Sequence, residues 1–275
     1  MPTQKEKAQH FKVLHERPGC FVIPNPWDIG SAKILAGLGF EALATTSAGL
    51  AFALGRSDCS GQVSQDEAFA NARDIVNATD LPVSGDLENG YQHHPEGVFT
   101  SISNALATGL VGASIEDTTG DPDDPIYPFE QAVERISAAS DAVKQMDISF
   151  MLTARSENFL HGRPDLADTI KRLQAFQDAG ADVLFAPGLK TKQDIQTLLK
   201  EVDRPVNVIM GLSGVNLSLH ELTEMGVKRI SLGSSLYRAA QGEFLRASRE
   251  VLDQGTFSFA EKASPYAELN KLFER

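Results

Sequence analysis

The sequence predicts an α/β fold, a (β/α)8 TIM barrel with a C-terminal helical extension. Short apolar runs occur eight times along the chain, and amphipathic stretches separate them. Several of these stretches end in a glycine directly before the next apolar run. Strands that alternate with helices form parallel sheets, and eight such units close into a barrel of about 250 residues. The length of 275 residues therefore suits one barrel domain.

Each of the eight apolar runs is predicted to be a buried strand. The runs cover residues 20–23, 42–45, 81–84, 111–115, 150–153, 183–186, 206–209 and 229–232. Helices that stop at a glycine precede four of the runs, with the glycines at Gly39, Gly109, Gly180 and Gly226. Residues 130–143 and 166–179 carry apolar side chains at helical spacing. A doubly wound open sheet is the alternative, but the count of eight and the lack of a GxGxxG motif after the first strand favour the barrel.

The tail beyond the eighth strand is predicted to be helical to about Leu252, to break at residues 255–259, and to end in a helix over residues 266–273. Its apolar side chains lie outside the eight barrel units. We therefore predict a single domain over residues 1–275, in which residues 240–275 form a helical tail that packs on a neighbouring subunit. The protein is accordingly expected to be a homo-oligomer.

Composition and charge exclude several classes of partner. The composition is that of an ordinary globular protein, with 42% hydrophobic and 23% charged residues. A formal net charge of −12 argues against a nucleic acid or an anionic membrane. The first residues contain no signal-peptide apolar segment, and no apolar run reaches membrane-spanning length. The two cysteines, Cys20 and Cys59, do not indicate a disulfide framework, so a cytoplasmic location is expected.

Acidic residues follow two neighbouring strands, and they are the most informative feature of the sequence. Asp86 and Glu88 follow the third apolar run, and Glu116 ends the fourth. Side chains two apart in a strand share a face, and two anions ~4 Å apart repel by roughly 4 kcal/mol at an effective dielectric near 20. Oxygen-only ligands suit Mg²⁺, or alternatively Mn²⁺. We predict that Asp86, Glu88 and Glu116 hold Mg²⁺; the alternative is that they cap helices or pair with arginines on the rim.

Other strand ends supply candidates for substrate binding. Arg155, after the fifth run, has a planar fork that can grip a carboxylate, or it forms an ion pair with Glu157 or Glu116. The small residues Ser47, Ala48 and Gly49 after the second run bring backbone N–H groups close to a ligand oxyanion, or they form only a tight turn. Trp27 and Asn207, from the first and seventh runs, complete the predicted substrate-binding set.

The loop over residues 118–128, TTGDPDDPIYP, follows the fourth strand. Its prolines, glycine and aspartates are typical of a mobile, solvated lid over a site, and equally of a plain acidic surface loop.

With these residues the chain resembles the isocitrate lyase/phosphoenolpyruvate mutase superfamily over about residues 10–250. The segments that carry the resemblance are 25–28 (NPWD), 46–49 (TSAG), 54–58 (LGRSD), 86–91 (DLENGY), 114–117 (SIED), 154–157 (ARSE) and 179–182 (AGAD). The resemblance implies a barrel that usually forms tetramers, often by exchange of the last helix. It also implies Mg²⁺ and the cleavage or formation of C–C or P–C bonds beside a 2-oxo acid, through an enolpyruvate-like intermediate.

The resemblance also implies roles for residues of this chain. Asp86, Glu88 and Glu116 match the metal-binding acids, with Asp58 close to them and catalytic. Ser47 and Ala48 match the groups that hold the oxo acid. Arg155 matches the clamp on a carboxylate or leaving group, and Thr118 stands where a hydrolytic member positions water.

Departures from the family pattern narrow the expected activity. Isocitrate and methylisocitrate lyases carry a Lys-Lys-Cys-Gly-His loop after the fourth strand, and phosphonomutases carry an Asn and a Lys there. Residues 118–128 contain no Lys, Cys, His or Asn. Glu88 replaces the usual aspartate, and Pro187-Gly188 stands where most members have His or Glu.

We therefore expect a Mg²⁺-dependent hydrolase or decarboxylase-like lyase that acts on an oxaloacetate-like, 3-substituted pyruvate. A phosphonomutase or a methylisocitrate lyase-like enzyme is the alternative within the family. Outside it stand a Schiff-base aldolase that uses Lys190, a phosphate-binding barrel that uses residues 211–214 and 233–235, and a catalytically inactive binding barrel. Trapping with borohydride and pyruvate, competition by inorganic phosphate, and a screen of 2-oxo acids with Mg²⁺ distinguish these alternatives.

Overall fold

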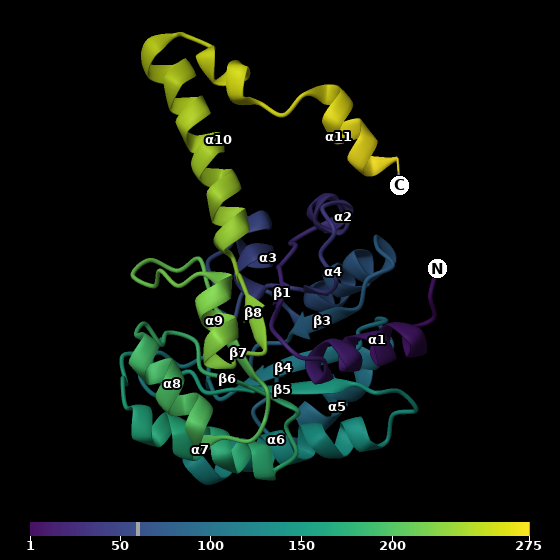
Figure 1. Cartoon of the computed structure of the whole chain (residues 1–275), viewed down its shortest axis with the longest axis vertical. Coiled ribbons are helices and arrows are strands. Elements are labelled where there is room, and N and C mark those ends of the chain that lie inside the picture. The colour runs from purple at the N-terminus through teal and green to yellow at the C-terminus, as the bar shows by residue number, and fades with distance from the viewer. Residues whose placement is uncertain (59–60, 275) are drawn as a thin grey trace.

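The computed structural model describes residues 1–58 and 61–274, and Figure 1 shows their arrangement. The described residues form one parallel sheet in the order β1-β8-β7-β6-β5-β4-β3-β2. Its strands are β1 (Phe21–Ile23), β2 (Leu43–Ala44), β3 (Val83–Asp86), β4 (Gly112–Glu116), β5 (Met151–Arg155), β6 (Val183–Phe185), β7 (Val206–Ile209) and β8 (Arg229–Ser231). β1 pairs with β8, and the N–H of Ala44 donates to the carbonyl of Pro24 just beyond β1 (3.1 Å). The sheet is thus a nearly closed barrel, and the predicted fold class is confirmed.

Helices connect the strands and surround the barrel (Figure 1). They are α1 (Gln4–Glu16), α2 (Ile29–Gly37), α3 (Ser47–Ala53), α4 (Gln65–Asn77), α5 (Pro95–Leu106), α6 (Phe129–Lys144), α7 (Leu166–Asp178), α8 (Lys192–Glu201), α9 (Leu219–Met225), α10 (Ser235–Gln254), the 3-10 helix η1 (Ser258–Lys262) and α11 (Tyr266–Phe273). The helices predicted over residues 130–143 and 166–179 agree with α6 and α7 within one residue at each end. Among the described residues, none of these helices combines the length and the apolarity needed to cross a bilayer.

Local sequence sets where the helices begin. Asp28 accepts a hydrogen bond from the N–H of Ser31 at the start of α2, and Thr46 accepts one from Gly49 at the start of α3. Such caps satisfy amide groups that have no partner inside the helix. Both helices directly follow the strands whose ends were predicted to bind substrate, so their caps fix these loops.

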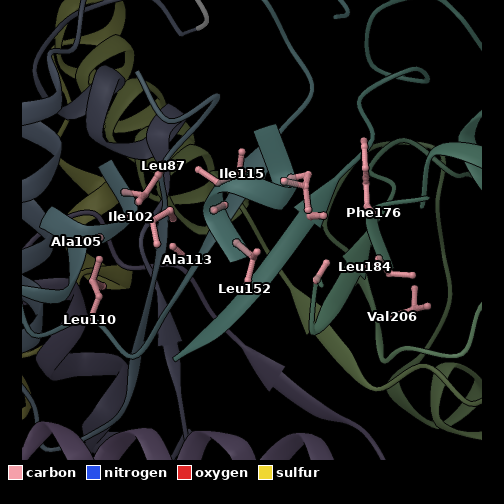
Figure 2. Packing of buried hydrophobic residues seen from close by; sticks show 14 of the residues in the cluster. Leu87, Ile102, Ala105, Leu110, Ala113, Ile115, Leu152, Phe176, Leu184 and Val206 are labelled. Carbon is pink, nitrogen blue, oxygen red and sulfur yellow. The ribbon is translucent and has the colours of Figure 1, made fainter. Parts of the chain in front are cut away.

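The core lies between the strands and the surrounding helices. Figure 2 shows Ile102 of α5, Ile115 of β4, Leu152 of β5 and Phe176 of α7 within it. All four are at most 2% exposed, and burial of each such side chain stabilises the fold by about 1.5–3 kcal/mol. Leu87, which separates Asp86 from Glu88, is buried in the same cluster.

Helix α1 closes the end of the barrel where the strands begin. Phe11 and Leu14 of α1 pack against a second cluster that contains Phe21, Met151 and Val183, each the first residue of its strand. Barrel chemistry belongs to the opposite end, where the strands stop. The candidate site is therefore sought there.

The tail leaves the barrel and returns to it. Figure 1 shows α10 projecting away from the strands and α11 lying near α2. α10 has no buried residue, and it carries the exposed side chains of Phe244, Leu245 and Leu252. The Nζ of Lys33 in α2 donates to the carbonyl of Phe273 (3.4 Å). An amphipathic helix that exposes several large apolar side chains is typical of a surface covered by another subunit.

Candidate active site

Arg155 lies at the centre of a cluster of acids where β3, β4 and β5 end. Its Nη1 is 3.2 Å from Asp86 Oδ1 and 3.2 Å from Glu116 Oε2, and its Nη2 is 2.6 Å from Glu157 Oε1. Strand register explains the convergence, because Glu116 pairs with Arg155 and Asp86 pairs with Ser114 across the ladders. The four charged side chains are between 3% and 16% exposed, so water screens them weakly. Burial opposes the charge of Arg155, but the three carboxylates outweigh it and raise the pKa of Arg155 well above its usual value.

Asp86 ties the end of β3 to the start of α3. Its Oδ2 accepts hydrogen bonds from the N–H (3.0 Å) and the hydroxyl (2.9 Å) of Ser47. Its own N–H donates to Thr45 Oγ1 (2.8 Å), and Ser114 Oγ lies 3.4 Å from Oδ1. Ser47, predicted to hold the oxo acid, therefore contacts a predicted metal ligand directly.

Glu88 reaches the same cluster by a route that the sequence did not predict. β3 ends at Asp86, and Glu88 has a left-handed backbone with φ +48°. The expectation that strand alternation places Asp86 and Glu88 on one face is therefore wrong. The N–H of Glu116 donates to the carbonyl of Glu88 (2.9 Å), which holds the turn beside β4. Burial, followed by the charges of Asp86, Glu116 and Asp58, raises the pKa of Glu88 to about 8.

Glu116 and Thr118 form the side of the cluster near the predicted lid. Thr118 Oγ1 donates to Glu116 Oε1 (2.6 Å). Burial raises the pKa of Glu116, Arg155 opposes the shift, and Asp86 and Asp58 add to it. Asp58 is thus close enough to act electrostatically on both Glu88 and Glu116.

The donor chemistry of this cluster fits a hard divalent cation. Asp86, Glu116 and Glu157 pair with one guanidinium, and Asp58 and Glu88 lie close enough to interact electrostatically with these acids. Within residues 1–58 and 61–274, no three acidic, histidine or cysteine side chains converge closely enough to cage an ion directly. Mg²⁺ loses water reluctantly and usually keeps several water ligands. The residues therefore fit an ion held partly through water, and they do not fit an all-protein cage.

Three further residues of the predicted substrate-binding set, Ala48, Gly49 and Trp27, lie around the start of α3. Ala48 and Gly49 follow Ser47 in α3, and the N–H of Gly49 donates to Thr46 Oγ1 (3.1 Å). A side chain at Gly49 would meet the Cβ of Trp27 at 3.4 Å. The Trp27 ring packs edge-on against Tyr237 of α10, with 5.2 Å between ring centroids.

Asn207, by contrast, lies within a separate polar network inside the barrel. Its Nδ2 donates to Ser231 Oγ (2.9 Å), and its Oδ1 accepts from Arg229 Nε (2.9 Å). Arg229 also donates to Thr153 Oγ1 (2.9 Å), two residues before Arg155 in β5. Asn207 is the second residue of β7, is buried, and pairs across the ladder with Phe185, the last residue of β6. These side-chain hydrogen bonds of Asn207 go to β8 and not to the acids around Arg155.

The predicted lid has an anchored base and an exposed tip. Thr118 and Ile126 form an antiparallel bridge, and Ile126 and Tyr127 are buried. Asp121, Asp123 and Asp124 are exposed, and Asp124 pairs with Arg163 at 3.3 Å. An exposed pair of this kind contributes about 0–1 kcal/mol, so it restrains the tip only weakly.

The residues of the non-family alternatives are placed less favourably. Lys190, the Schiff-base candidate, is exposed beyond β6. The N–H groups of Leu232 and Gly233, which a phosphate would need, donate to Asn25 Oδ1 (2.9 and 2.8 Å). Asn25 thus occupies the amide groups at the end of β8.

Two buried arginines behind the site were missed by the sequence analysis. Arg172 of α7 pairs with Asp117 (3.2 Å), whose Oδ1 accepts from the N–H of Glu157 (2.8 Å). Arg135 of α6 is 1% exposed. The sequence does contain a signal for them. Each arginine stands on the apolar face of its helix, as Arg135 does between Ala132 and Ile136, and a charged residue at such a position indicates a buried polar contact.

The chain is similar to several known proteins over nearly its whole length. A family model described as phosphoenolpyruvate phosphomutase matches residues 11–252. The crystal structure of a candidate lyase/mutase from Burkholderia cenocepacia J2315 superposes with a TM-score of 0.96 at 51% identity, covering 99% of this chain and 97% of that one. A protein from Mycobacterium tuberculosis, named only as uncharacterized protein Rv1998c, is 30% identical over 94% of each chain. An oxaloacetate decarboxylase from Marinomonas sp. is 25% identical over 98% of this chain and 94% of its own.

Proposed function

We propose that this chain, which belongs to the phosphoenolpyruvate phosphomutase family and is an enzyme of the wider isocitrate lyase superfamily, cleaves a C–C bond of an oxaloacetate-like 2-oxo acid with the help of Mg²⁺. The observation that carries the proposal is the surplus of carboxylates around Arg155 at the strand ends. The named activity of the Marinomonas relative supports an oxaloacetate-like substrate. The reaction is a decarboxylation or a hydrolysis that proceeds through an enolpyruvate-type intermediate.

Cleavage beside a ketone leaves an enolate, whose charge must be stabilised where it develops. Asp86, Glu88 and Glu116 would hold Mg²⁺, or Mn²⁺ in its place, partly through water and with Asp58 nearby. When bound, the ion supplies a Lewis acid for the developing negative charge.

Arg155 is proposed to orient the substrate carboxylate or the leaving group. Glu157 accepts from its Nε (2.8 Å) and Nη2, so the guanidinium plane is fixed. Nη1 then faces Asp86 and Glu116, towards the proposed substrate. The amides of Ser47 and Ala48 are proposed to bind the keto oxygen, with Gly49 and Trp27 as the adjoining wall. A substrate-binding role for Asn207 is not part of the proposal, given its place in the barrel interior.

Thr118 is proposed to decide whether water takes part. Its hydroxyl donates to Glu116, which leaves its lone pairs free to orient a water molecule for a hydrolysis. A decarboxylation needs no attacking water, and Thr118 would then serve only to hold Glu116.

P–C bond chemistry is the second candidate, because the matching family model is described as phosphoenolpyruvate phosphomutase. The loop over residues 118–128 lacks the Asn and Lys expected of a phosphonomutase, so C–C cleavage is preferred.

A screen of 2-oxo acids with Mg²⁺, oxaloacetate first, tests the proposed activity. Asp86→Ala should lower turnover by about 10³-fold or more, because it removes both a proposed ion ligand and a partner of Arg155. Asp147→Ala is the matched control, since Asp147 is an exposed acid paired with Lys5 far from the site. Full turnover in the Asp86 variant, or full activity in EDTA, would refute the proposal. A borohydride adduct at Lys190 would instead support the Schiff-base aldolase.

We also propose that the chain acts as one domain within a cytoplasmic homo-oligomer, a dimer or a tetramer. The exposed apolar face of α10 supports assembly. The low number of cysteines supports a reducing compartment; of the two, Cys20 is a free thiol and Cys59 lies outside the described residues.

A further inference from the structure

The loop after β3 is the most strained segment of the described chain. Within residues 1–58 and 61–274, only Glu88 (φ +48°) and Tyr91 (φ +58°) are non-glycine residues with positive φ. Gly90 between them also has positive φ (+79°). Such conformations persist only where surrounding contacts over-determine them, and they cluster at functional sites. Something outside the loop must therefore hold it.

Arg135 supplies these contacts from behind. Its Nη1 donates to the carbonyls of Gln92 (2.6 Å) and His93 (2.6 Å), and its Nη2 donates to the carbonyl of Asn89. Arg135 forms no ion pair with any residue that the structure describes. Its buried guanidinium is instead satisfied by hydrogen bonds to carbonyl oxygens of this loop. The planar fork reaches several acceptors in a fixed arrangement, which a flexible ammonium cannot reproduce.

Tyr127 joins this clamp to the end of β4. The Arg135 guanidinium lies 4.2 Å from the centroid of the Tyr127 ring. The Tyr127 hydroxyl is 2.7 Å from His93 Nδ1, and the backbone N–H of Tyr127 donates to the carbonyl of Asp117 (2.9 Å). The loop that carries Glu88 is thereby fixed relative to the strand that carries Glu116.

We propose that Arg135 is a positioning residue that holds Glu88 in its left-handed conformation and so aims its carboxylate at Asp86 and Glu116. The proposal rests on the proposed function for the role of Glu88 as an ion ligand. Arg135 itself lies outside the acidic cluster and would position Glu88, which belongs to it.

The test compares Arg135→Lys with wild type by hydrogen exchange and by Mn²⁺ affinity. The amides of Gly90 and Tyr91 bond within the loop, to Leu87 O (2.7 Å) and Asn89 Oδ1 (3.0 Å), and report its opening. Exchange over residues 89–93 should quicken by about tenfold or more in the variant. Mn²⁺ affinity should fall by about 10–100-fold, as for loss of groups that orient metal ligands. Arg135→Gln, which buries no unpaired charge, replaces the lysine variant if that variant does not fold.

Arg229→Lys is the matched control, because Arg229 is likewise buried and likewise bonds to neutral partners, Asn207 and Thr153. It should change neither local exchange in the loop nor Mn²⁺ affinity. Unchanged exchange and affinity in both Arg135 variants would overturn the proposal and leave Arg135 a packing residue. Absence of Mn²⁺ binding in wild type would instead refute the proposed function, while the exchange comparison would still decide whether Arg135 holds the loop.

Discussion

Among the individual residues of the site, Arg155 is central: its single guanidinium neutralises part of the charge of a cluster of five carboxylates. Removal of one partner from a buried ion pair is strongly destabilising, by about 3–5 kcal/mol, because the other charge is left without compensation. Glu88 receives no bond from Arg155 that would offset its burial, and it responds by a raised pKa. A bound cation would reverse that shift.

Glu88 therefore predicts how stability varies with pH in the metal-free protein. Its pKa is about 8 in the folded chain and near 4.5 in the unfolded chain, so only the folded state binds this proton between those values. The contribution of this proton to the free energy of unfolding is full below about pH 4.5 and is lost as pH rises through about 8. Glu88→Gln should flatten this loss, which amounts to roughly 2–4 kcal/mol. Urea unfolding in EDTA at about pH 6 and 8 measures the free energy of unfolding of wild type and variant. An equal fall in this free energy between the two pH values for both proteins would contradict the prediction.

Much of the cluster could be predicted from residue types at strand ends, and two features could not. Asp86, Glu116 and Arg155 converge because parallel strands end at one edge. Local periodicity does not encode which partners an inward-facing residue meets inside the barrel, so the bonds of Asn207 to Ser231 and Arg229 cannot be predicted from the sequence. The left-handed turn at Glu88 depends on Arg135, which lies 47 residues away in the sequence and meets the loop only in the folded protein.

At the scale of elements, apolar runs locate the strands within about two residues, and the deviations have local causes. β3 begins at Val83, two residues later than predicted, because Pro82 has no N–H to give to the ladder. The helix predicted over residues 266–273 coincides with α11 (Tyr266–Phe273). The contact between α1 and the barrel interior, in contrast, was not foreseen.

His15 of α1 makes that contact, and it predicts a sensitivity to acid. Its Nδ1 donates to the carbonyl of Phe11 (2.8 Å), so its Nε2 is left to accept from Arg229 Nη1 (3.4 Å). Burial, followed by the charge of Arg229, lowers the pKa of His15 to about 3 from 6.5. Between these values only the unfolded chain binds the proton, so His15 lowers stability progressively as pH falls from about 6.5 towards 3.

His15→Gln keeps an acceptor for Arg229 but cannot titrate. The variant should lose less stability than wild type between about pH 7 and 4.5, whatever its stability at neutral pH. Urea unfolding at the two pH values measures this. If the free energy of unfolding of the variant falls as much as that of wild type between the two pH values, His15 does not titrate on unfolding.

In the molecule as a whole, α10 exposes an apolar face that residues 1–58 and 61–274 leave uncovered. Phe244 is 64% and Leu252 84% exposed on a helix of 20 residues. Figure 1 shows α10 projecting away from the barrel. Exposed apolar patches on stable proteins usually mark interfaces.

We expect light scattering to give a mass of two or four chains for wild type. Phe244→Glu should shift the protein to smaller species, because it places a charge in the apolar contact. Arg249→Glu, a charge change at an exposed polar position of the same helix, should leave the mass unchanged. A monomeric wild type, or equal effects of both variants, would contradict the assembly proposed for α10.

The central claim is that acids from adjacent strands hold a divalent cation against which a 2-oxo acid binds. Anomalous scattering from a crystal soaked with Mn²⁺ and oxalate, a planar mimic of the enolate, tests it most directly. We predict a manganese peak beside Asp86, Glu88 and Glu116, with oxalate oxygens between the ion and Arg155. A site without manganese, or with Arg155 still bonded to Asp86 and Glu116 and no space between them and the oxalate, would contradict the claim.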